Sequence, residues 1–331
     1  MKVLFIGGTG IISEACTWKA AETGFEVYLF NRGETKVPLP EGVRILRGDI
    51  RDREGARKVL DGRRFDAVVN WIAYVPEHIE TDLSLFRGRT GQYVFISSAS
   101  VYQKPLSHFM ITESTPLANP FWEYSRNKIA CELRLMQAYR EENFPVTIVR
   151  PSYTYSYRLV PCAVGSGPVV LDRIKKGLEV IVHGDGKSLW VMTHHRDFAE
   201  GFTGLLGNIQ ALGESFHITS DEVLTWDQIY NAIGLAAGKE PRIVHLPSEL
   251  IQAYNPHMGA GLLGDKAYSA VFDNSKIKRI VPGFQARVPF VRGVKEAVAW
   301  VGKNAAPGDR EREESRWMDR VIASYREAFS G

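Results

Sequence analysis

The first thirteen residues of the chain, MKVLFIGGTGIIS, constrain its fold more than any other stretch. Val3 to Ile6 is an unbroken apolar run, typical of a strand buried on both faces of a parallel sheet. Gly7-Gly8-Thr9-Gly10 then predicts a tight turn, and residues 12–23 predict a helix that ends at Gly24. A strand, a glycine turn and a helix N-terminus together present free backbone N–H groups, which suits a diphosphate. A plain structural turn would show the same short pattern, so the following motifs decide between the two interpretations.

Strands and helices alternate along the first 150 residues with short connections. This alternation predicts an α/β fold with a doubly wound parallel sheet of the Rossmann type, in which a dinucleotide binds at the carboxyl ends of the strands. We expect a dinucleotide-binding domain over residues 1–151, which also uses parts of 188–220, and a smaller, mainly substrate-binding lobe over 152–331. The predicted strands are 3–6, 26–30, 43–46, 66–72, 93–97 and 146–149, and the predicted helices between them are 12–23, 52–60, 77–86 and 120–140.

The end of the second predicted strand bears on the choice of dinucleotide. Asn31 lies 24 residues after Gly7, near where an acidic residue usually binds the ribose of NAD. An acid there would repel a 2′-phosphate, whereas Asn31 removes that repulsion and Arg32 could pair with the phosphate. The two residues favour NADP over NAD, although a solvated arginine in a polar turn would also explain Arg32.

Tyr124 and Lys128 are the candidates for proton transfer. They stand at i and i+4 of a helix that we expect to begin at Pro120, with Asn119 as its N-cap, so both side chains share one helix face. An ammonium group beside a phenol lowers the pKa of the phenol and prepares it to exchange a proton near neutral pH. The same spacing also arises by chance on surface helices, so it does not establish a role alone.

Five short motifs in order along the chain resemble the extended short-chain dehydrogenase/reductase family, in its NAD(P)-dependent sugar epimerase/dehydratase group. The closing segments 273–276 and 294–300 continue the resemblance. The resemblance implies hydride transfer between a nicotinamide cofactor and a sugar carbon, while the protein positions that carbon and moves the proton. The five motifs are GGTG at 7–10, GDI at 48–50, SASVY at 98–102, YSRNK at 124–128 and RPS at 150–152.

The resemblance also implies roles for individual residues. Tyr124 would be the catalytic acid/base, Lys128 would hold the nicotinamide ribose, and Ser98 would bind the reacting oxygen. The expected cofactor-binding residues are Gly7, Thr9, Gly10, Ile11, Ile12, Asn31, Arg32, Asp49, Ile50, Trp71, Ile72, Ala73, Tyr124, Lys128 and Pro151. The candidate substrate-binding residues are Ser98, Ser100, Tyr153, Trp190 and His194.

Departures from the family pattern narrow the expected chemistry. Ala99 and Ser100 stand where the dehydratases usually carry an acid pair, so no carboxyl group is placed to remove a C5 proton and expel water. The sequence therefore argues against 4,6-dehydration and leaves epimerisation or oxidoreduction. Ser13 replaces the third glycine of the first turn, which implies either looser helix packing or an added phosphate contact.

The usual residues for a nucleoside diphosphate on the substrate are also missing. Trp190 stands where an arginine often binds that diphosphate, and an indole has a single donor. Trp190 and the tyrosines at 153, 155 and 157 could stack on a sugar or belong to the core, and the sequence leaves both open. We expect a sugar or sugar-derived substrate, with or without a nucleotide. The cations that could bind a diphosphate instead are Arg158, Lys187 and Arg196.

Composition excludes several other classes of function. A net charge of +3 over 331 residues provides no basic field for nucleic acid or an anionic membrane. The three cysteines are far apart, and His194-His195 falls in a predicted helix over 193–208 where the two side chains diverge, so no metal is expected. The chain shows no signal peptide and no stretch long enough to span a bilayer, which predicts a cytoplasmic protein.

The second half of the chain suggests how the site could be covered. The glycine-rich segment 255–266 predicts a mobile loop over the pocket, and residues 226–237 predict a helix capped by Thr225. Residues 308–331 predict a long charged helix. The resemblance further implies a homodimer that forms through the helix of Tyr124 and its neighbour.

One alternative function remains from the sequence. A catalytically silent dinucleotide-sensing or RNA-binding protein could use the same fold, because a plant chloroplast RNA-binding branch shares the Arg-Gly ending of the second strand. The set of Ser98, Tyr124 and Lys128 argues against this alternative, as does the lack of a basic stripe with exposed aromatic residues.

Overall fold

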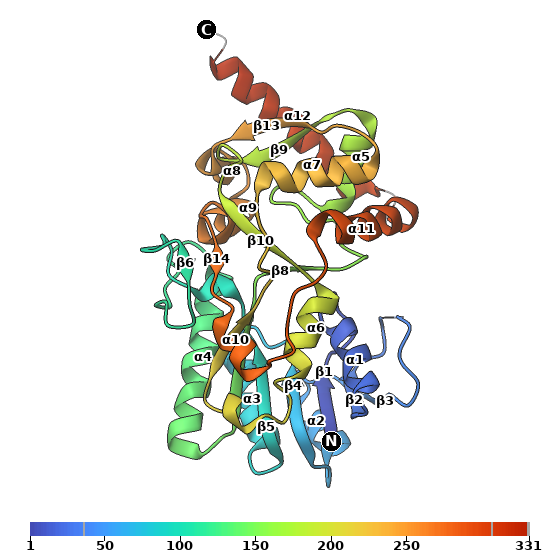
Figure 1. Ribbon diagram of the computed structural model, residues 1–331, viewed down its shortest axis with the longest axis vertical. Coiled ribbons are helices and arrows are strands. Elements are labelled where there is room, and N and C mark those ends of the chain that lie inside the picture. The colour runs from blue at the N-terminus through green and yellow to red at the C-terminus, as the bar shows by residue number, and fades with distance from the viewer. Residues whose placement is uncertain (36, 306, 330–331) are drawn as a thin grey trace.

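The centre of the molecule is a seven-stranded parallel sheet in the order β11-β7-β5-β4-β1-β2-β3 (Figure 1). The computed structural model describes residues 1–35, 37–305 and 307–329. The strand order reverses between β1 and β4, and this switch point is where doubly wound sheets bind ligands. The predicted fold class is confirmed. The strands are β1 (Lys2–Ile6), β2 (Glu26–Asn31), β3 (Arg44–Arg47), β4 (Phe65–Asn70), β5 (Thr90–Ile96), β7 (Val146–Pro151) and β11 (Ser215–Ile218).

Helices cover both faces of this sheet, which explains the apolar run at its centre. Along β1, Val3 and Phe5 belong to the core under one face, whereas Leu4 and Ile6 belong to the core under the other. The helices α1 (Ser13–Glu22), α6 (His195–Thr203) and α10 (Ser275–Ile280) pack on the first face. The helices α2 (Arg53–Leu60), α3 (Pro76–Phe86) and α4 (Glu123–Glu142) pack on the second face.

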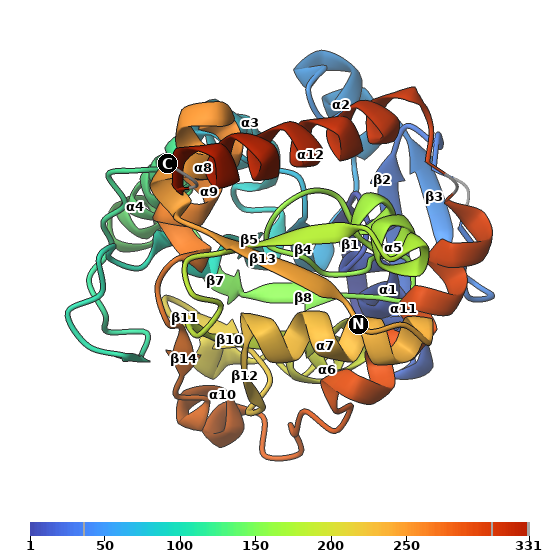
Figure 2. The ribbon, with the colours of Figure 1, turned by 90° about the horizontal axis from the view of Figure 1, so that it is seen from above.

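A smaller lobe sits beyond the carboxyl ends of the strands and has its own core (Figure 1). It contains a three-stranded sheet β12-β10-β8 and a parallel pair β13-β9. Figure 2 shows α7 and α12 on opposite sides of this lobe. Thr225 caps α7 as predicted, in a capping box with Gln228. The strands are β8 (Tyr153–Tyr155), β9 (Glu179–His183), β10 (Leu189–His194), β12 (Val223–Thr225) and β13 (Arg242–Leu246), and the helices are α5 (Gly167–Lys176), α7 (Trp226–Ala237), α8 (Ser248–Tyr254), α11 (Phe290–Asn304) and α12 (Asp309–Phe329).

The long charged helix predicted over residues 308–331 is α12, and its last two positions, 330–331, lie outside the described residues.

Short strands and 3₁₀ helices lie between the longer elements. The strands β6 (Met110–Ile111) and β14 (Val271–Phe272) pair with each other, although about 160 residues separate them. The 3₁₀ helices η1 (Ala99–Val101) and η2 (Ile209–Ala211) follow β5 and α6. Because β11 and α6 come from the second half of the chain yet pack on the large sheet, the chain crosses between the lobes more than once.

Two helices begin at least two residues later than the sequence predicts. The helix expected from residue 193 begins at His195, because Thr193 and His194 instead continue β10 and pair with β8. The helix expected from Pro120 begins at Glu123, because the Asn119 side chain folds the preceding turn. Its Oδ1 accepts hydrogen bonds from the backbone N–H groups of residues 121 and 122, at 3.2 and 3.1 Å.

The mobile loop predicted over residues 255–266 is instead helical. It forms α9 (Pro256–Gly261), followed by a π-helical turn, η3 (Leu262–Lys266). Its glycines permit close packing rather than motion. A Cβ on Gly259 would lie 2.2 Å from the Cβ of Gln252, and one on Gly264 would lie 2.7 Å from the Cβ of Trp122.

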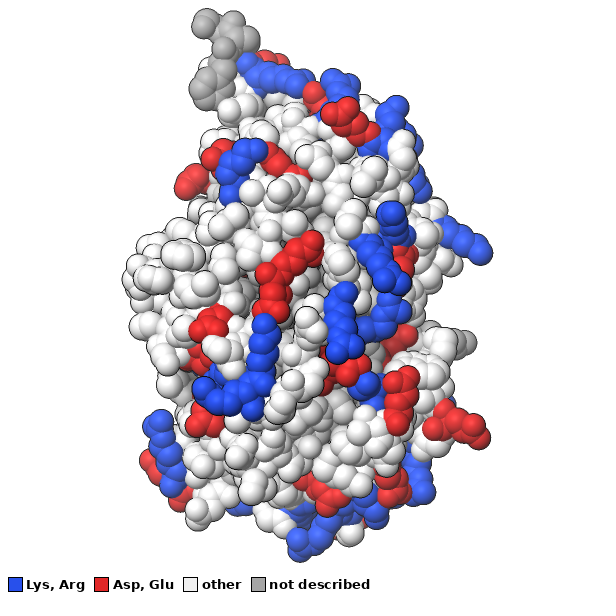
Figure 3. All heavy atoms as spheres, in the orientation of Figure 1, with Lys and Arg blue, Asp and Glu red and all other residues white. Residues whose placement is uncertain are grey.

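The surface carries charges of both signs. On the face shown in Figure 3, Lys and Arg lie interspersed with Asp and Glu. Among the described residues, no helix combines the length and the apolar composition needed to cross a membrane.

Candidate functional site

The glycine turn lies at the carboxyl end of β1, at the switch point of the sheet. Gly7 and Gly8 have φ angles of +102° and +93°, in the region that favours glycine. A Cβ on Gly7 would lie 3.4 Å from the Cβ of Trp71, and one on Gly8 would lie 2.6 Å from Cδ2 of Leu29. The turn therefore needs residues without side chains, and its bare backbone lines a hollow of about 1200 Å³.

The N-terminus of α1 faces the same hollow. No side chain in the described part of the protein caps this helix at Ile12. Ser13, in place of a third glycine, is buried, and its Oγ accepts a 2.8 Å hydrogen bond from the Gly10 N–H group. Ser13 thus shapes the turn from within. The Glu14 N–H group donates a 3.0 Å hydrogen bond to the Gly10 carbonyl oxygen, so an anion would bind the other N–H groups at this helix end.

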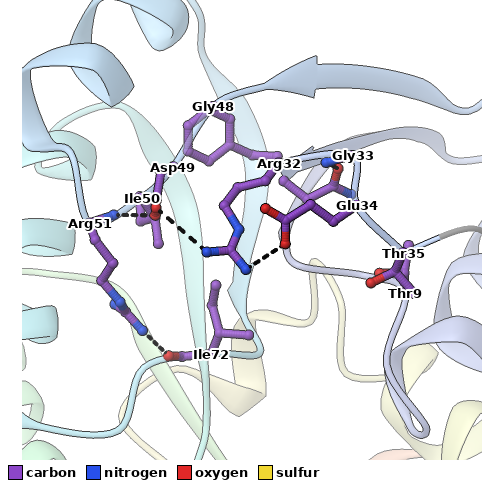
Figure 4. Close-up of a pocket in the computed structure, with 12 residues that line it drawn as sticks. Thr9, Arg32, Gly33, Glu34, Thr35, Gly48, Asp49, Ile50, Arg51 and Ile72 are labelled. Carbon is purple, nitrogen blue, oxygen red and sulfur yellow. Dashed lines mark hydrogen bonds and ion pairs between the residues drawn. The ribbon is translucent and has the colours of Figure 1, made fainter.

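A second hollow, of about 750 Å³, extends past the ends of β2 and β3 (Figure 4). Thr9, Thr35 and Ile72 line both hollows, so the two form one cleft along the carboxyl edge of the sheet. Ala73 is the expected cofactor residue that does not line it, because its side chain is fully buried. The expected cofactor residues that line the cleft are Gly7, Thr9, Gly10, Ile11, Ile12, Asn31, Arg32, Asp49, Ile50, Trp71, Ile72, Tyr124, Lys128 and Pro151.

Asn31 connects the end of β2 to the glycine turn. Its Nδ2 donates a 3.2 Å hydrogen bond to the carbonyl oxygen of Gly7, and its Oδ1 accepts a 2.9 Å hydrogen bond from the Gly33 N–H group. An amide provides both a donor and an acceptor, whereas an aspartate would provide only acceptors. Asn31 therefore has a structural role besides its neutral charge.

Arg32 projects over the second hollow between two acids (Figure 4). Its guanidinium lies 2.8 Å from the carboxylate of Glu34 and 4.0 Å from that of Asp49, and its side chain is 61% exposed. The sequence pattern did not anticipate Glu34 as a competitor for this guanidinium. Exposure keeps the ion pairs weak, so Arg32 remains available to a phosphate.

Tyr124 lies in the first turn of α4 and lines the cleft. Its ring centre is 4.8 Å from that of Trp122 and 6.4 Å from that of Tyr74. Burial raises the pKa of the Tyr124 phenol to about 12, and the nearby Ser98 hydroxyl acts in the opposite direction. The phenol is therefore protonated at neutral pH.

Lys128 is buried one helical turn further along α4. Its Nζ donates 2.7 Å hydrogen bonds to the carbonyl oxygens of Ala73 and Ile96, at the ends of β4 and β5. Nζ also lies 5.8 Å from the centre of the Tyr124 ring. Burial lowers the pKa of Lys128 to about 7.

The predicted effect of Lys128 on the Tyr124 phenol is wrong for this structure. The sequence predicts a lowered phenol pKa, but burial dominates and raises it. Lys128 directs its hydrogen bonds at main-chain carbonyls rather than at the phenol, and its own pKa is lowered toward neutrality.

Ser98 follows β5 and belongs to a chain of hydroxyls. Its Oγ lies 2.9 Å from that of Ser100, which accepts a 2.7 Å hydrogen bond from the Ser125 hydroxyl. Ser100 is buried, and neither Ser98 nor Ser100 is among the residues that line the cleft. Ser98 instead reaches the cleft through its contact with the Tyr124 phenol. Ala99 is likewise buried, and no acid stands beside Ser98 in this short helix.

Three of the candidate substrate residues from the second half of the chain do not line the cleft. Trp190 is 1% exposed and packs on Trp226 in the core of the small lobe, with ring centres 5.4 Å apart. His194 is fully buried as the N-cap of α6, and burial lowers its pKa to about 4. Tyr153 is half-buried, and its hydroxyl bonds the backbone of Cys162. The sequence left open whether Trp190 stacks on a sugar or belongs to the core, and the structure places it in the core.

The cleft residues that the sequence missed or misassigned include Tyr74 and Arg158. Tyr74 directly follows the predicted Trp71-Ile72-Ala73 stretch, so its place after a strand end was a usable signal. Arg158 was considered only for a substrate diphosphate, but it lies against the glycine turn. The other two candidate cations pair elsewhere: Lys187 with Asp227 and Arg196 with Glu296.

The described residues include no cluster of three or more His, Cys, Asp or Glu side chains that could hold a metal ion. The Nε2 atom of His183 lies 2.8 Å from the backbone carbonyl oxygen of Lys266, at hydrogen-bond distance. The cleft does fit a dinucleotide: the bare glycine backbone, the uncapped N-terminus of α1 and the polar ends of β2 and β3 follow one another along it.

A parallel sheet with a glycine turn at its switch point and a Tyr–Lys pair beside it defines a dinucleotide-binding α/β protein. Residues 3–219 match the model of the NAD dependent epimerase/dehydratase family. This match covers more than half of the chain, and the chain belongs to that family. The expectation from the sequence is thereby confirmed.

The names of individual relatives describe different functions. A 2′-dehydrokanamycin reductase of Streptomyces kanamyceticus is 25% identical over 94% of this chain and 87% of its own length. The chloroplast stem-loop binding protein of 41 kDa b of Arabidopsis thaliana is 28% identical over 77% of this chain and 66% of its own length. In fold, the chain resembles the UDP-glucose 4-epimerase of Thermus thermophilus in complex with NAD. The TM-score is 0.71, with 23% identity, over 92% of this chain and 100% of that chain.

The relatives also include dehydratases. A dTDP-glucose 4,6-dehydratase of an Actinoplanes species is 28% identical over 66% of this chain and 62% of its own length. The comparisons therefore do not support the exclusion of 4,6-dehydration that the sequence suggested.

Proposed function

We propose that the protein is an NAD(P)-dependent sugar epimerase or oxidoreductase that acts by hydride transfer at a carbinol or carbonyl carbon. The observation that carries the proposal is the convergence of Tyr124, Lys128 and the glycine turn on one cleft, with Ser98 beside Tyr124. The bound nicotinamide would supply the hydride chemistry. The protein would supply binding, orientation and the proton.

The Tyr124 phenol is the proposed proton donor. Because its pKa is raised to about 12, it holds a proton at neutral pH and can give it to the oxygen of a reacting carbonyl. The Ser98 hydroxyl would hold the same oxygen, and Ser100 and Ser125 would orient that hydroxyl.

Lys128 is proposed to hold the nicotinamide ribose. Its two bonds to main-chain carbonyls fix Nζ at the ends of β4 and β5, next to the Tyr124 ring. In its protonated form Lys128 has three donors, so it retains one for a ligand hydroxyl. Lys128 would thus position the ribose and the Tyr124 phenol relative to each other.

The proposed substrate is a sugar or sugar derivative that need not carry a nucleotide. Trp190 replaces the arginine that often binds a nucleotide diphosphate, and it is buried in the core. The reductase of Streptomyces kanamyceticus, which aligns with 94% of the chain, has a name that specifies no nucleotide. The structures of UDP-glucose 4-epimerases argue for the same fold and not for the same substrate.

A screen of free, phosphorylated and nucleotide-linked sugars would test the proposal. Cofactor absorbance reports net oxidation or reduction, and product NMR reports epimerisation or dehydration, in which the cofactor is regenerated. Turnover of any such sugar that is lost in Tyr124→Phe supports the proposal. No turnover across the screen, with the dinucleotide bound, contradicts it.

The name of the Arabidopsis relative supports a second candidate function, binding of an RNA stem-loop. A positively charged surface would be expected for that function, whereas Figure 3 shows charges of both signs on the face drawn. Salt-dependent affinity for a stem-loop RNA, without hydride transfer to any sugar, would favour this candidate over the enzyme.

A further inference from the structure

Arg158 reaches from the small lobe to the glycine turn of the large one. It follows β8, and its side chain lines the hollow formed by residues 7–13. Its Nη2 donates a 3.2 Å hydrogen bond to the carbonyl oxygen of Thr9. The side chain is 17% exposed, so its guanidinium is largely removed from solvent.

A buried acid holds this guanidinium in place. Glu14, in the first turn of α1, is 5% exposed, and its Oε2 lies 2.5 Å from Nη2 of Arg158. The Tyr157 hydroxyl donates a 2.8 Å hydrogen bond to the other oxygen, Oε1. An acid at this helix N-terminus would repel a bound anion, and Arg158 cancels its charge.

The guanidinium is not saturated by these contacts. An arginine has five N–H donors in a planar fork, and the contacts above occupy Nη2. The Nε atom of Arg158 is buried and has no hydrogen-bond partner among the described residues. A buried charged donor normally has an acceptor, so Arg158 retains unused hydrogen-bonding capacity beside the hollow that its side chain lines.

We propose that Arg158 binds the diphosphate of the dinucleotide, opposite the N–H groups of the α1 N-terminus. This inference rests on the dinucleotide of the proposed function and adds a cation that the second lobe contributes. Planar bidentate donors suit the oxygens of a diphosphate. Glu14 and Tyr157 position the guanidinium, so binding of the diphosphate would tie the small lobe to the large one.

Arg158 could bind a diphosphate either on the substrate or on the cofactor. Arg158 was a candidate to bind a diphosphate on the substrate, but its contacts lie at Thr9 and Glu14, on the cofactor side of the cleft. We therefore assign Arg158 to the cofactor.

Affinity measured by isothermal titration calorimetry tests the assignment without turnover. Wild type and Arg158→Gln are titrated with NAD, NADP and ADP-ribose, which share the diphosphate, and with UDP. Arg158→Gln is expected to lower the affinity for NAD, NADP and ADP-ribose by about 10- to 100-fold, which corresponds to the loss of a charge-assisted hydrogen bond. Arg196→Gln, the same change in a neighbouring arginine paired with Glu296, is the matched control and should leave all affinities unchanged.

A double variant guards against misfolding. Arg158→Gln leaves Glu14 buried without its partner, whereas Glu14→Gln/Arg158→Gln removes both charges. The double variant should still bind the dinucleotides more weakly than wild type, although less weakly than Arg158→Gln, because the repulsion from Glu14 is removed as well. Unchanged dinucleotide affinity in the folded double variant overturns the assignment, as does a loss confined to UDP. If wild type binds no dinucleotide at all, the cofactor of the proposed function is wrong as well, so the two failures are distinguishable.

Discussion

Nζ of Lys128 lies 5.8 Å from the centre of the Tyr124 ring, yet it gives its two hydrogen bonds to main-chain carbonyls. Lys128 thereby connects α4, which also carries Tyr124, to the segments at the ends of β4 and β5. The phenol remains protonated because burial, rather than the ammonium, controls its pKa.

Replacement of the phenol tests its role as the proton donor. Tyr124→Phe should lower turnover by about 10²- to 10⁴-fold, the usual contribution of general acid–base catalysis, while the dissociation constant of the dinucleotide stays unchanged. Steady-state kinetics and calorimetry check the two parts. Tyr139→Phe, which changes an exposed tyrosine on the same helix, is the control. Full activity in Tyr124→Phe would contradict the assignment.

The buried lysine should make stability depend on pH. The pKa of Lys128 falls from its usual value near 10.5 to about 7 on folding, so between these values the unfolded chain binds more protons than the folded one. The contribution of Lys128 to the free energy of unfolding should therefore rise with pH from about 7 to 10.5 and change little below pH 7. Urea denaturation of wild type and Lys128→Met across this range measures the difference. A difference that is constant with pH would contradict the shift.

The charges around Arg32 should determine the choice of dinucleotide. We expect NADP to bind more tightly than NAD. Arg32→Gln should lower the affinity for NADP by about 10-fold and leave the affinity for NAD unchanged. Glu34→Gln should strengthen NADP, because Glu34 competes for the same guanidinium. Dissociation constants from nicotinamide fluorescence test both variants. A clear preference of the wild type for NAD would show that the prediction from Asn31 and Arg32 is wrong.

The homodimer remains a prediction, and α4 offers a place for it. Leu133 on this helix is 64% exposed, so its side chain is accessible to a partner. We expect the wild type to elute at the mass of a dimer in size-exclusion chromatography with light scattering, and Leu133→Asp to elute as a monomer. Leu235→Asp, which alters an exposed leucine on α7, should leave the mass unchanged. A monomeric wild type would refute the dimer.

The Asn119 side chain should stabilise the segments that surround the site. Its Nδ2 donates hydrogen bonds of 2.8 and 2.7 Å to the carbonyl oxygens of Ser100 and Gly264, which joins the turn after β5 to η3. Asn119→Asp keeps the acceptor but loses both donors, and should lower the free energy of unfolding by about 1–3 kcal/mol. Thermal denaturation measures the loss, and KM should rise because η3 packs against Trp122 beside Tyr124. Unchanged stability would mean that the two carbonyls find other donors.

The sequence by itself determined the large sheet and the cofactor end of the site. An apolar run that alternates between two cores, a glycine turn and a helix are local features, and their order along the chain implies one topology through right-handed crossovers. Residues that directly follow strand ends, such as Asp49 and Trp71, therefore fell on the cleft as expected.

Only the tertiary structure decided which side chains of the small lobe reach the cleft. Trp190 and His194 have residue types suited to a pocket, but the packing of α7, α11 and β8 buries them. The glycines of 255–266 signalled flexibility locally, whereas contacts with Gln252 and Trp122 made them positions of close helix packing. The pKa of the Tyr124 phenol also depends on the tertiary structure. Desolvation by all the neighbours in space raises this pKa, and it outweighs the charge of Lys128, which is the only neighbour that the i, i+4 spacing predicts.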